Sequence, residues 1–375
     1  MNIVNRKRLI QTFIDLVTIP SPSWHEAGVI EYIIRRAESL NMTWKKYPCG
    51  ESHNLLLKLP GTSGVKPVLF SGHTDTVIPC ENVKPVISNT RITSDGTTIL
   101  GSDDKAAIAM FIEGITCILE NNIEHGPIEV LLTCAEEQSL QGIKGFDLSE
   151  VDSKHAFVFD SNGRIGNIIL KAPYHSKISI SVRGKSAHAG MEPEKGINAI
   201  NVLSEIITRL PSGRIDSETT CNIGTVSGGR ATNIVADEAS CMMEIRSIDK
   251  KKLKKYETII RDIAKKTAYK HGAGTKISIN LEYSGFSISK KDEIVAVAVE
   301  ALSKIHIKHE FLISGGGSDT NIINRGRIKA INLSCGMEKV HTTKEYIRIK
   351  DLVDGTRLVI AIASTMVSHA GGKAK

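Results

Sequence analysis

The chain has 375 residues, of which 41% are hydrophobic, and Lys and Arg outnumber Asp and Glu by 48 to 41. This length and composition allow two domains that each bury a core, and they require neither a disordered tail nor a disulfide scaffold. The formal charge of +7 is small for a chain of this size, so it predicts no nucleic-acid partner.

The pattern of the N-terminal segment predicts no export signal. Residues 1–26 lack the sustained apolar stretch and the small-residue cleavage site of a secretory signal peptide. No later stretch approaches the roughly 18 consecutive apolar residues that a membrane-spanning helix needs. We therefore predict a cytoplasmic protein without a membrane partner.

Residues from about 8 to 40 have helical periodicity, and four short apolar segments after them run directly into polar residues. These segments are VLF before SGHTD, IEVLLTC before AEE, HAFVF before DSNG, and IKAINLSC before a loop that contains His341. A helix is predicted from Lys105 to Asn121, between the first two. Apolar strands alternating with helices predict an α/β fold with a doubly wound, mostly parallel sheet, whose ligands gather beyond the carboxyl ends of the strands.

From about Tyr174 to residue 284 the pattern changes. The segment SKISISVRG alternates apolar and polar residues, as expected for a strand with one solvated face. A helix, two strands, a second helix and a last strand follow, which is the β-α-β-β-α-β order of a ferredoxin-like domain. We therefore predict a first domain made of residues 1–173 and 285–375, with an α+β domain inserted at residues 174–284.

Two pairs of polar residues stand where metal ligands could lie. His73 and Asp75 form an H-x-D pair at a strand end, where period-two alternation sends both side chains to one side, so Asp75 could orient a ligating imidazole. Asp103 and Asp104 are adjacent acids at a helix start, whose repulsion a cation would offset. Each pair alone is also compatible with a plainer role, a surface loop for the first and helix capping for the second.

The adjacent acids Glu136 and Glu137 follow an apolar strand, where unpartnered carboxylates would face a water-poor cleft. One could bind a metal while the other moves protons, and a solvated pair at a strand exit is the alternative. Asp160 in FDSNG and His341 in KVHTT complete a set of imidazoles and carboxylates without thiolates. Such a set suits zinc, and cobalt or manganese could substitute.

These motifs resemble those of a large family of dizinc peptidases and amidohydrolases that includes peptidase T, carboxypeptidase G, aminoacylase and succinyl-diaminopimelate desuccinylase. The resemblance covers nearly the whole chain, because SGHTDTV, GSDDKAA, AEEQSLQG, FDSNG, SAHAG, GGGSDTN and GMEKVHTT stand in the family's order. The FDSNG and GMEKVHTT segments are most similar to the peptidase T-like, tripeptide aminopeptidase-like branch. The family's inserted lid or dimerisation domain also matches the predicted domain order.

The resemblance implies roles for the candidate metal ligands. Two Zn²⁺ ions per chain are expected, one bound by His73 and Asp160 and the other by Glu137 and His341. Asp103 would bridge both ions.

The resemblance also implies the catalytic roles. Glu136 would be the general base and acid that acts on a zinc-activated water. Asp75 would orient His73, and Asp104 would follow a cis peptide bond.

Four further residues receive their roles through the resemblance. His188 in SAHAG is similar to a histidine that stabilises the oxyanion, often in the active site of the other subunit of a dimer, and a turn residue with satisfied hydrogen bonds is the alternative. Asn233 and Arg246 are similar to residues that contact the substrate carboxylate or backbone, and a purely structural role is the alternative. Gly316 in GGGSDTN would line the substrate cleft, since no P-loop Lys-Ser/Thr follows this glycine run. A homodimer through the inserted domain is implied.

The predicted function is hydrolysis of a peptide bond in small peptides by a dizinc metallopeptidase, with a tripeptide aminopeptidase as the leading identity. The same chemistry on an N-acyl amino acid or a C-terminal peptide bond, as in a deacylase or carboxypeptidase, stays open because fold does not separate them. A non-catalytic metal- or peptide-binding protein is disfavoured, since Glu136 and all candidate ligands are present. The segment DKKKLKK predicts a solvated helix, because no aromatic residues or nucleic-acid-binding motif accompany it.

Overall fold

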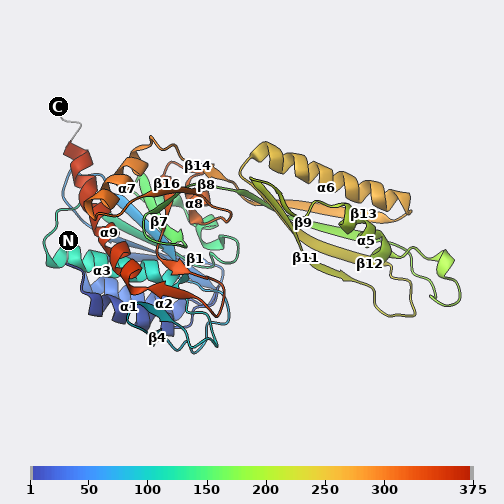
Figure 1. The fold of residues 1–375 in the computed structure, drawn as a ribbon, viewed down its shortest axis with the longest axis horizontal. Helices are drawn as coiled ribbons and strands as arrows, with labels where there is room; N and C mark the ends of the chain where they lie inside the picture. Colours follow the sequence, from blue (N-terminus) through green and yellow to red (C-terminus); the bar gives the residue numbers. More distant parts are fainter. Residues whose placement is uncertain (1–2, 372–375) are drawn as a thin grey trace. The chain divides into compact units, whose positions relative to one another are not determined.

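A computed structural model describes residues 3–371 of the chain. The described chain forms two compact units (Figure 1). The large unit contains residues 3–170, 287–314 and 318–371, and the inserted unit contains Lys171–Phe286 together with Gly315–Gly317. No helix among the described residues is both long enough and apolar enough to cross a bilayer.

The large unit is built on a mixed sheet of nine strands, in the order β1-β2-β6-β3-β7-β16-β8-β14, with β15 also paired to β8. Its centre is parallel, because β3 pairs in parallel with β6 and β7, and β7 with β16. The pairs β1-β2, β2-β6 and β16-β8 are antiparallel. The prediction of a mostly parallel sheet therefore holds for the centre, and the antiparallel flanks were not predicted. The strands are β1 (Thr43–Cys49), β2 (Ser52–Leu59), β3 (Val68–His73), β6 (Ile128–Thr133), β7 (His155–Ser161), β8 (Asn167–Ala172), β14 (Phe286–Ser287), β15 (Glu310–Ile313) and β16 (Lys329–Ser334).

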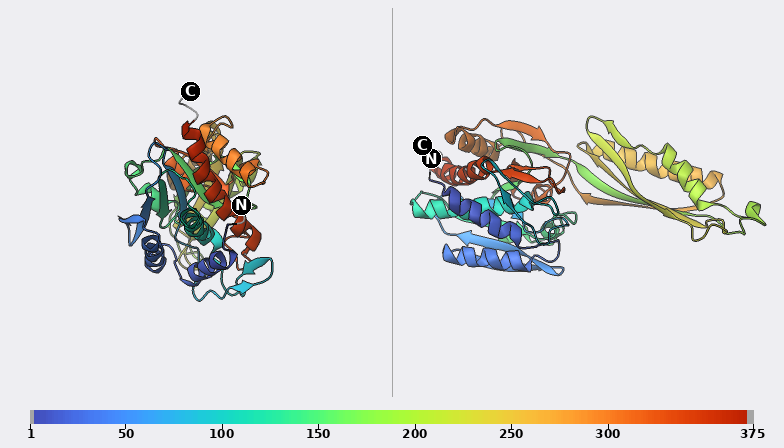
Figure 2. Two further views of the ribbon diagram at one scale, coloured as in Figure 1. Left: turned by 90° about the vertical axis from the view of Figure 1, so that its left-hand side faces the viewer. Right: turned by 60° about the horizontal axis from the view of Figure 1, so that its bottom comes forward.

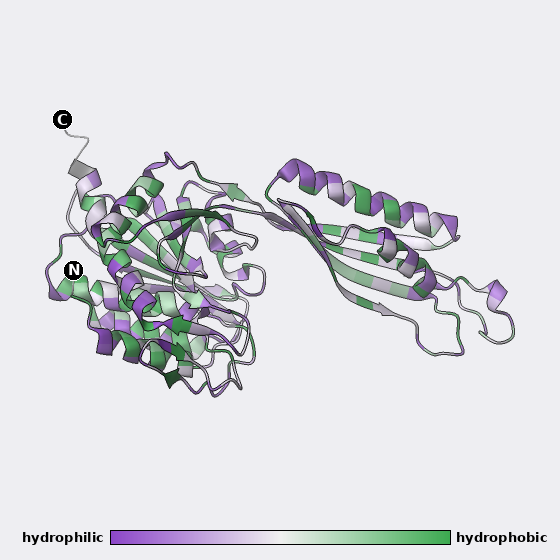
Figure 3. Ribbon diagram, viewed as in Figure 1, coloured by the Kyte–Doolittle hydropathy of each residue, from purple (hydrophilic) through white to green (hydrophobic). Residues whose placement is uncertain are grey.

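Helix α3 (Ser102–Glu120) lies at the middle of the large unit, packed against β3 and β7 and against helices α1 and α9. Nearly all of its side chains are buried, and most of them are apolar, although Asp103, Asp104, Lys105 and Glu113 are buried as well. Figure 3 shows the hydropathy of each residue along the ribbon. The other helices of this unit are α1 (Arg6–Thr18), α2 (Ala27–Ser39), α4 (Gln141–Lys144), α7 (Glu293–Lys304), α8 (Asp319–Ile323) and α9 (Ile349–Gly371). Figure 2 shows these helices against the sheet from two further directions.

A second, small sheet of the large unit was not predicted. Its four short strands lie in the order β17-β18-β5-β4 and come from two distant parts of the chain. They are β4 (Val86–Ile87), β5 (Arg91–Thr93), β17 (Met337–Glu338) and β18 (Tyr346–Arg348). The loop that carries His341 connects β17 to β18, so this sheet anchors both ends of that loop.

The inserted unit is an antiparallel sheet in the order β10-β11-β12-β9-β13. Its four long strands and two helices follow one another as predicted for a ferredoxin-like domain, and the short strand β10 is an addition. Residues that alternate along the strands, such as Ile178, Ile180 and Val182, form its core with one side of each helix. The elements are β9 (Tyr174–Arg183), α5 (Ala199–Arg209), β10 (Gly213–Asp216), β11 (Thr219–Gly228), β12 (Glu238–Ser247), α6 (Lys250–Lys270) and β13 (Gly274–Tyr283).

Candidate metal centre and active site

The parallel strands deliver polar side chains to one edge of the large sheet. His73 is the last residue of β3 and pairs with Thr133, the last residue of the neighbouring strand β6. Glu136 follows β6 by three residues, and Asp160 lies near the end of β7, the strand on the other side of β3. Adjacent parallel strands end at the same edge, so these groups converge although up to 87 positions separate them in the sequence.

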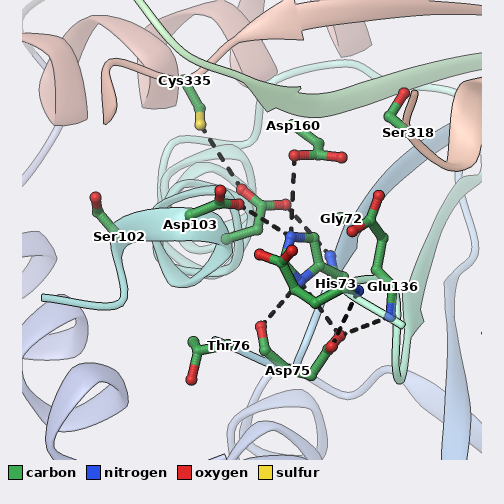
Figure 4. Close-up of polar contacts among 12 residues, drawn as sticks. Gly72, His73, Asp75, Thr76, Ser102, Asp103, Glu136, Asp160, Ser318 and Cys335 are labelled. Carbon is green, nitrogen blue, oxygen red and sulfur yellow. Dashed lines mark hydrogen bonds and ion pairs between the residues drawn. The ribbon is translucent and has the colours of Figure 1, made fainter. Parts of the chain in front are cut away.

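His73 lies at the centre of the cluster and is almost fully buried (Figure 4). Its Nε2 atom is 3.0 Å from Asp103 Oδ1 and 3.9 Å from Asp160 Oδ1. Its Nδ1 atom is 2.9 Å from the Asp75 main-chain oxygen and 3.4 Å from Asp75 Oδ1. Contacts on Nδ1 leave Nε2 to face the acids, which is the arrangement of an imidazole oriented to bind a metal.

His341 lies on the other side of Asp103. Its Nε2 atom is 3.3 Å from Asp103 Oδ2 and 2.8 Å from Glu137 Oε1. The two oxygens of the Asp103 carboxylate therefore face two different histidines, His73 and His341. The peptide bond between Asp103 and Asp104 is cis, as the resemblance implied.

Asp75 also holds the turn that carries the two glutamates. Its Oδ1 atom accepts a hydrogen bond from the main-chain N–H of Glu136 (2.9 Å), and its Oδ2 atom accepts one from that of Glu137 (3.2 Å). Ser23 donates a third hydrogen bond to this carboxylate. Asp75 thus links the orientation of His73 to the position of the glutamate turn.

The charges of the cluster are those of a site for divalent cations. Burial, together with the nearby carboxylate of Asp160, raises the pKa of Glu136 well above its ordinary value. Burial and the nearby carboxylate of Asp103 raise the pKa of Asp160 well above its ordinary value. Hydrogen bonds to Asp103 and Glu137 raise the pKa of His341 to about 10. Crowded carboxylates with two imidazoles are hard or borderline donors, and a cation between them would remove their repulsion.

Two groups of side chains among residues 3–371 are close enough together to hold an ion. One is His73, Asp103 and Glu137, and the other is His73, Asp104 and Asp160. Asp104 was not predicted as a ligand, and its Oδ2 atom accepts a hydrogen bond from the main-chain N–H of His73. The residues present therefore fit a site for divalent cations, and the division of ligands between two ions stays a prediction.

The inserted unit places His188 and Asn233 side by side. Their two chain segments pair through a β-bridge between His188 and Ile234 and through a hydrogen bond from the Ala189 N–H to the Asn233 carbonyl oxygen. The His188 Nδ1 atom accepts hydrogen bonds from the N–H groups of Gly190 and Met191, both 3.2 Å long. An Nδ1 atom that accepts leaves the proton of a neutral imidazole on Nε2, so Nε2 is the hydrogen-bond donor.

Arg246 lies far from His188 within the same unit. It pairs with His175 near the start of β9, whereas the His188 segment follows Arg183 at the end of that strand. Eight residues of strand separate these ends, which corresponds to roughly 26 Å. The guanidinium of Arg246 makes two hydrogen bonds to Glu244, of 3.0 and 3.1 Å.

Gly316, the remaining predicted substrate contact, lies in the loop between β15 and α8. The neighbouring Gly317 packs against Tyr283, because a Cβ atom at this position would lie 2.3 Å from the tyrosine ring. No substrate contact of Gly316 follows from this geometry, and its role stays a prediction.

The sequence-based set did not include three residues that hold the site. Asn332 accepts a hydrogen bond from the Asp160 N–H and donates one to the Asp160 carbonyl oxygen. Glu26 accepts from the N–H of Ala135, next to the glutamates. Glu345 accepts from the N–H of Asp103. The only sequence signal was the nearness of Glu345 to His341, since a lone Asn or Glu carries no motif.

Comparisons with known proteins identify the family of this chain. Residues 174–272 match the M20 peptidase dimerisation domain. The uncharacterized protein YqjE of Bacillus subtilis is 40% identical over 364 residues, which cover 96% of this chain and 98% of that protein. The crystal structure of the aminopeptidase PepT from Bacillus cereus superposes with a TM-score of 0.90 at 37% identity, covering 98% of this chain and 100% of that one.

A tripeptidase from Staphylococcus aureus is similar over the same extent. Its crystal structure superposes with a TM-score of 0.94 at 34% identity, covering 98% of this chain and all of the other. Both structures are similar to this chain over its two units, in sequence as well as in fold. The chain therefore belongs to the M20 family of peptidases.

Proposed function

We propose that this protein is a metal-dependent aminopeptidase that removes the N-terminal residue from tripeptides. The observation that carries the proposal is the Asp103 carboxylate, whose two oxygens face His73 at 3.0 Å and His341 at 3.3 Å. A carboxylate between two histidines suits a paired-metal centre. The names of the similar Bacillus cereus aminopeptidase and Staphylococcus aureus tripeptidase support the substrate class.

In this proposal His73 and Asp160 hold one Zn²⁺ ion, Glu137 and His341 hold the second, and Asp103 is shared. Cobalt or manganese would fit the same donors. When bound, such a pair of ions polarises the scissile carbonyl and makes water a stronger acid. Asp75 holds the Nδ1 side of His73, so its Nε2 atom stays directed at the ion.

Glu136 moves the proton. Its main chain is held by Asp75, and its carboxylate lies in a buried setting that raises its pKa well above the ordinary value. A carboxylate with a raised pKa can accept a proton from the attacking water and return it to the leaving amine near neutral pH. The side chain of Glu136 belongs to neither ligand group among the described residues, which leaves it available for this role.

The separation of His188 from Arg246 favours a dimer. A fully extended tripeptide spans only about 10 Å, less than half of the strand length between these residues. One copy of the inserted unit therefore cannot supply both contacts to one substrate. We propose a homodimer through the inserted domain, in which Arg246 contacts the substrate in one site, whereas Asn233 contacts the substrate and His188 donates a hydrogen bond from its Nε2–H to the oxyanion in the other protomer's site.

The variant His188→Ala is expected to lower kcat by ~100-fold or more, because an oxyanion donor acts mainly in the transition state. Metal content should be unchanged. The matched control is His271→Ala, which removes an exposed histidine of the same unit that contacts Glu205. If kcat stays the same in both variants by steady-state assay, the oxyanion role of His188 is wrong.

A substrate panel tests the proposed activity. Tripeptides, the same tripeptides acetylated at the amine, dipeptides and N-acyl amino acids are incubated with protein loaded with zinc, cobalt or manganese. We expect cleavage of free tripeptides, loss of cleavage on acetylation, and complete loss with a chelator. Preferred cleavage of N-acyl amino acids would indicate the deacylase alternative, and release of the C-terminal residue a carboxypeptidase. No cleavage of any compound would favour a binding protein.

We also propose that the enzyme works in the cytoplasm. All seven cysteines are free, and six of them are buried. Unpaired buried thiols are typical of proteins in a reducing compartment.

A further inference from the structure

We infer that Glu345 is a positioning residue of the metal centre, which ties together the two chain segments that present Asp103 and His341. This inference rests on the proposed function, because it concerns the same centre. It adds a residue that is neither a candidate ligand nor a group that moves a proton.

The side-chain carboxylate of Glu345 is directed at residues 100–103, which form the start of α3 and the two positions before it. Its Oε2 atom accepts hydrogen bonds from the N–H groups of Leu100 and Gly101, both 2.8 Å long. Its Oε1 atom accepts one from the Ser102 hydroxyl (2.6 Å) and one from the Asp103 N–H (3.1 Å). The carboxylate is almost fully buried, so these four donors take the place of water.

This segment depends on outside acceptors. Gly101 has a φ of 77°, and Asp103 and Asp104 have non-helical backbone angles inside the first turn of α3. The first N–H groups of a helix have no intrahelical partners, and buried N–H groups need an acceptor. Glu345 supplies this acceptor for the N–H of Asp103, the residue whose side chain faces both His73 and His341. The direction of the Asp103 carboxylate therefore depends on Glu345.

Glu345 is also part of the His341 segment. It follows His341 by four residues, and its own N–H donates to the Thr342 carbonyl oxygen at 3.1 Å. Strand β18 begins at the next residue, Tyr346, and pairs with β17 and β5. One carboxylate thus joins a segment near residue 100 to one near residue 340, and each of them presents a candidate ligand.

The substitution Glu345→Gln tests this with little change of shape. A glutamine amide has one acceptor oxygen and one NH₂ donor. If its oxygen faces Leu100 and Gly101, its NH₂ group faces Ser102 and Asp103. The Ser102 hydroxyl can turn and accept, but the Asp103 N–H then points at another donor. The opposite orientation leaves two N–H groups without an acceptor.

The experiment measures Co²⁺ binding to the metal-free full chain by titration and by the visible spectrum of the bound ion. We expect Glu345→Gln to weaken Co²⁺ affinity by about 10-fold to 100-fold, the usual effect of losing a group that supports metal ligands, and to change the spectrum. Excess Co²⁺ should restore part of the peptidase activity. A purely structural role would lower stability and leave affinity and spectrum unchanged.

Glu129→Gln is the matched control. Glu129 is as buried as Glu345 and accepts from the N–H groups of Asp152 and Ser153 and from the Ser153 hydroxyl, with Lys58 as a further partner. It lies on β6 four positions before the end of the strand, away from the ligand cluster. We expect this variant to lose stability in thermal unfolding and to bind Co²⁺ like the wild type.

The outcomes separate this inference from the proposed function. If the wild type binds no Co²⁺, the proposed metal centre fails. If the wild type binds Co²⁺ and Glu345→Gln binds it equally well, only the role of Glu345 is overturned. If Glu345→Gln does not fold, the variant Ser102→Ala tests the inference instead, because it removes one of the four hydrogen-bond donors to the Glu345 carboxylate. That variant should bind Co²⁺ several-fold more weakly, about what one lost hydrogen bond predicts, and unchanged binding would overturn the inference.

Discussion

Replacing Glu136 with glutamine is expected to lower kcat by ~100-fold to 10,000-fold while the protein keeps its metal. Glutamine preserves the shape of the side chain but cannot accept a proton from water or return it to the leaving amine. The hydrogen bond from the main-chain N–H at this position to Asp75 does not involve the side chain, so the turn should keep its structure. Steady-state kinetics and elemental analysis of the same preparation measure both quantities.

Glu137→Gln is the natural comparison, because it changes the adjacent and chemically identical side chain. The Glu137 Oε1 atom lies 2.8 Å from His341 Nε2. We therefore expect this variant to lose part of its metal and to recover part of its activity with excess zinc or cobalt. Added metal should not rescue Glu136→Gln. If Glu136→Gln loses metal and Glu137→Gln retains it, the two roles are reversed.

Among the single replacements of candidate ligands, Asp103→Asn is expected to cause the largest loss of metal and of activity. The Asp103 carboxylate faces His73 with one oxygen and His341 with the other, so removing its charge weakens metal binding on both sides. We expect metal content to fall from about two ions per chain to less than one, and kcat/KM to fall by ~1,000-fold or more, since metal ions supply several kcal/mol of transition-state stabilisation.

Asp160→Asn provides the contrast. Asp160 is grouped with His73 and Asp104, not with His341, so this variant should keep the ion that Glu137 and His341 are proposed to hold. Asp147→Asn, an exposed helix-capping residue outside the site, controls for a general effect of the substitution. Equal metal loss in Asp103→Asn and Asp160→Asn would show that Asp103 is not shared between two ions.

The sequence predicted the parts of the fold that rest on local patterns. Strands β3, β6, β7 and β16 each contain a short apolar segment and are buried along nearly their whole length, as expected for strands covered on both faces of a parallel sheet. The alternation in β9 predicted a sheet with one solvated face in the inserted unit. Both patterns depend on the burial of neighbouring residues along one strand, so a single chain reveals them.

The antiparallel flanks of the large sheet and the small sheet β17-β18-β5-β4 were not predicted. Strand β18 pairs with β5, which lies more than 250 positions earlier in the chain. Strands of two or three residues are too short to show a period, and no local pattern encodes their distant partners.

The sequence by itself identified which residue types could form a metal centre and that His73, Glu136, Glu137 and Asp160 lie at or just after strand ends. Only the tertiary structure decided the contacts of the site residues. It placed the Asp103 carboxylate between His73 and His341. It also placed Asp75 where it accepts a hydrogen bond from the Glu136 N–H, and Arg246 where it donates hydrogen bonds to Glu244. The acceptors Asn332 and Glu345 bond residues about 170 and 240 positions away. Their roles arise because folding buries N–H groups that must find an acceptor, and the nearest one is set by packing in space.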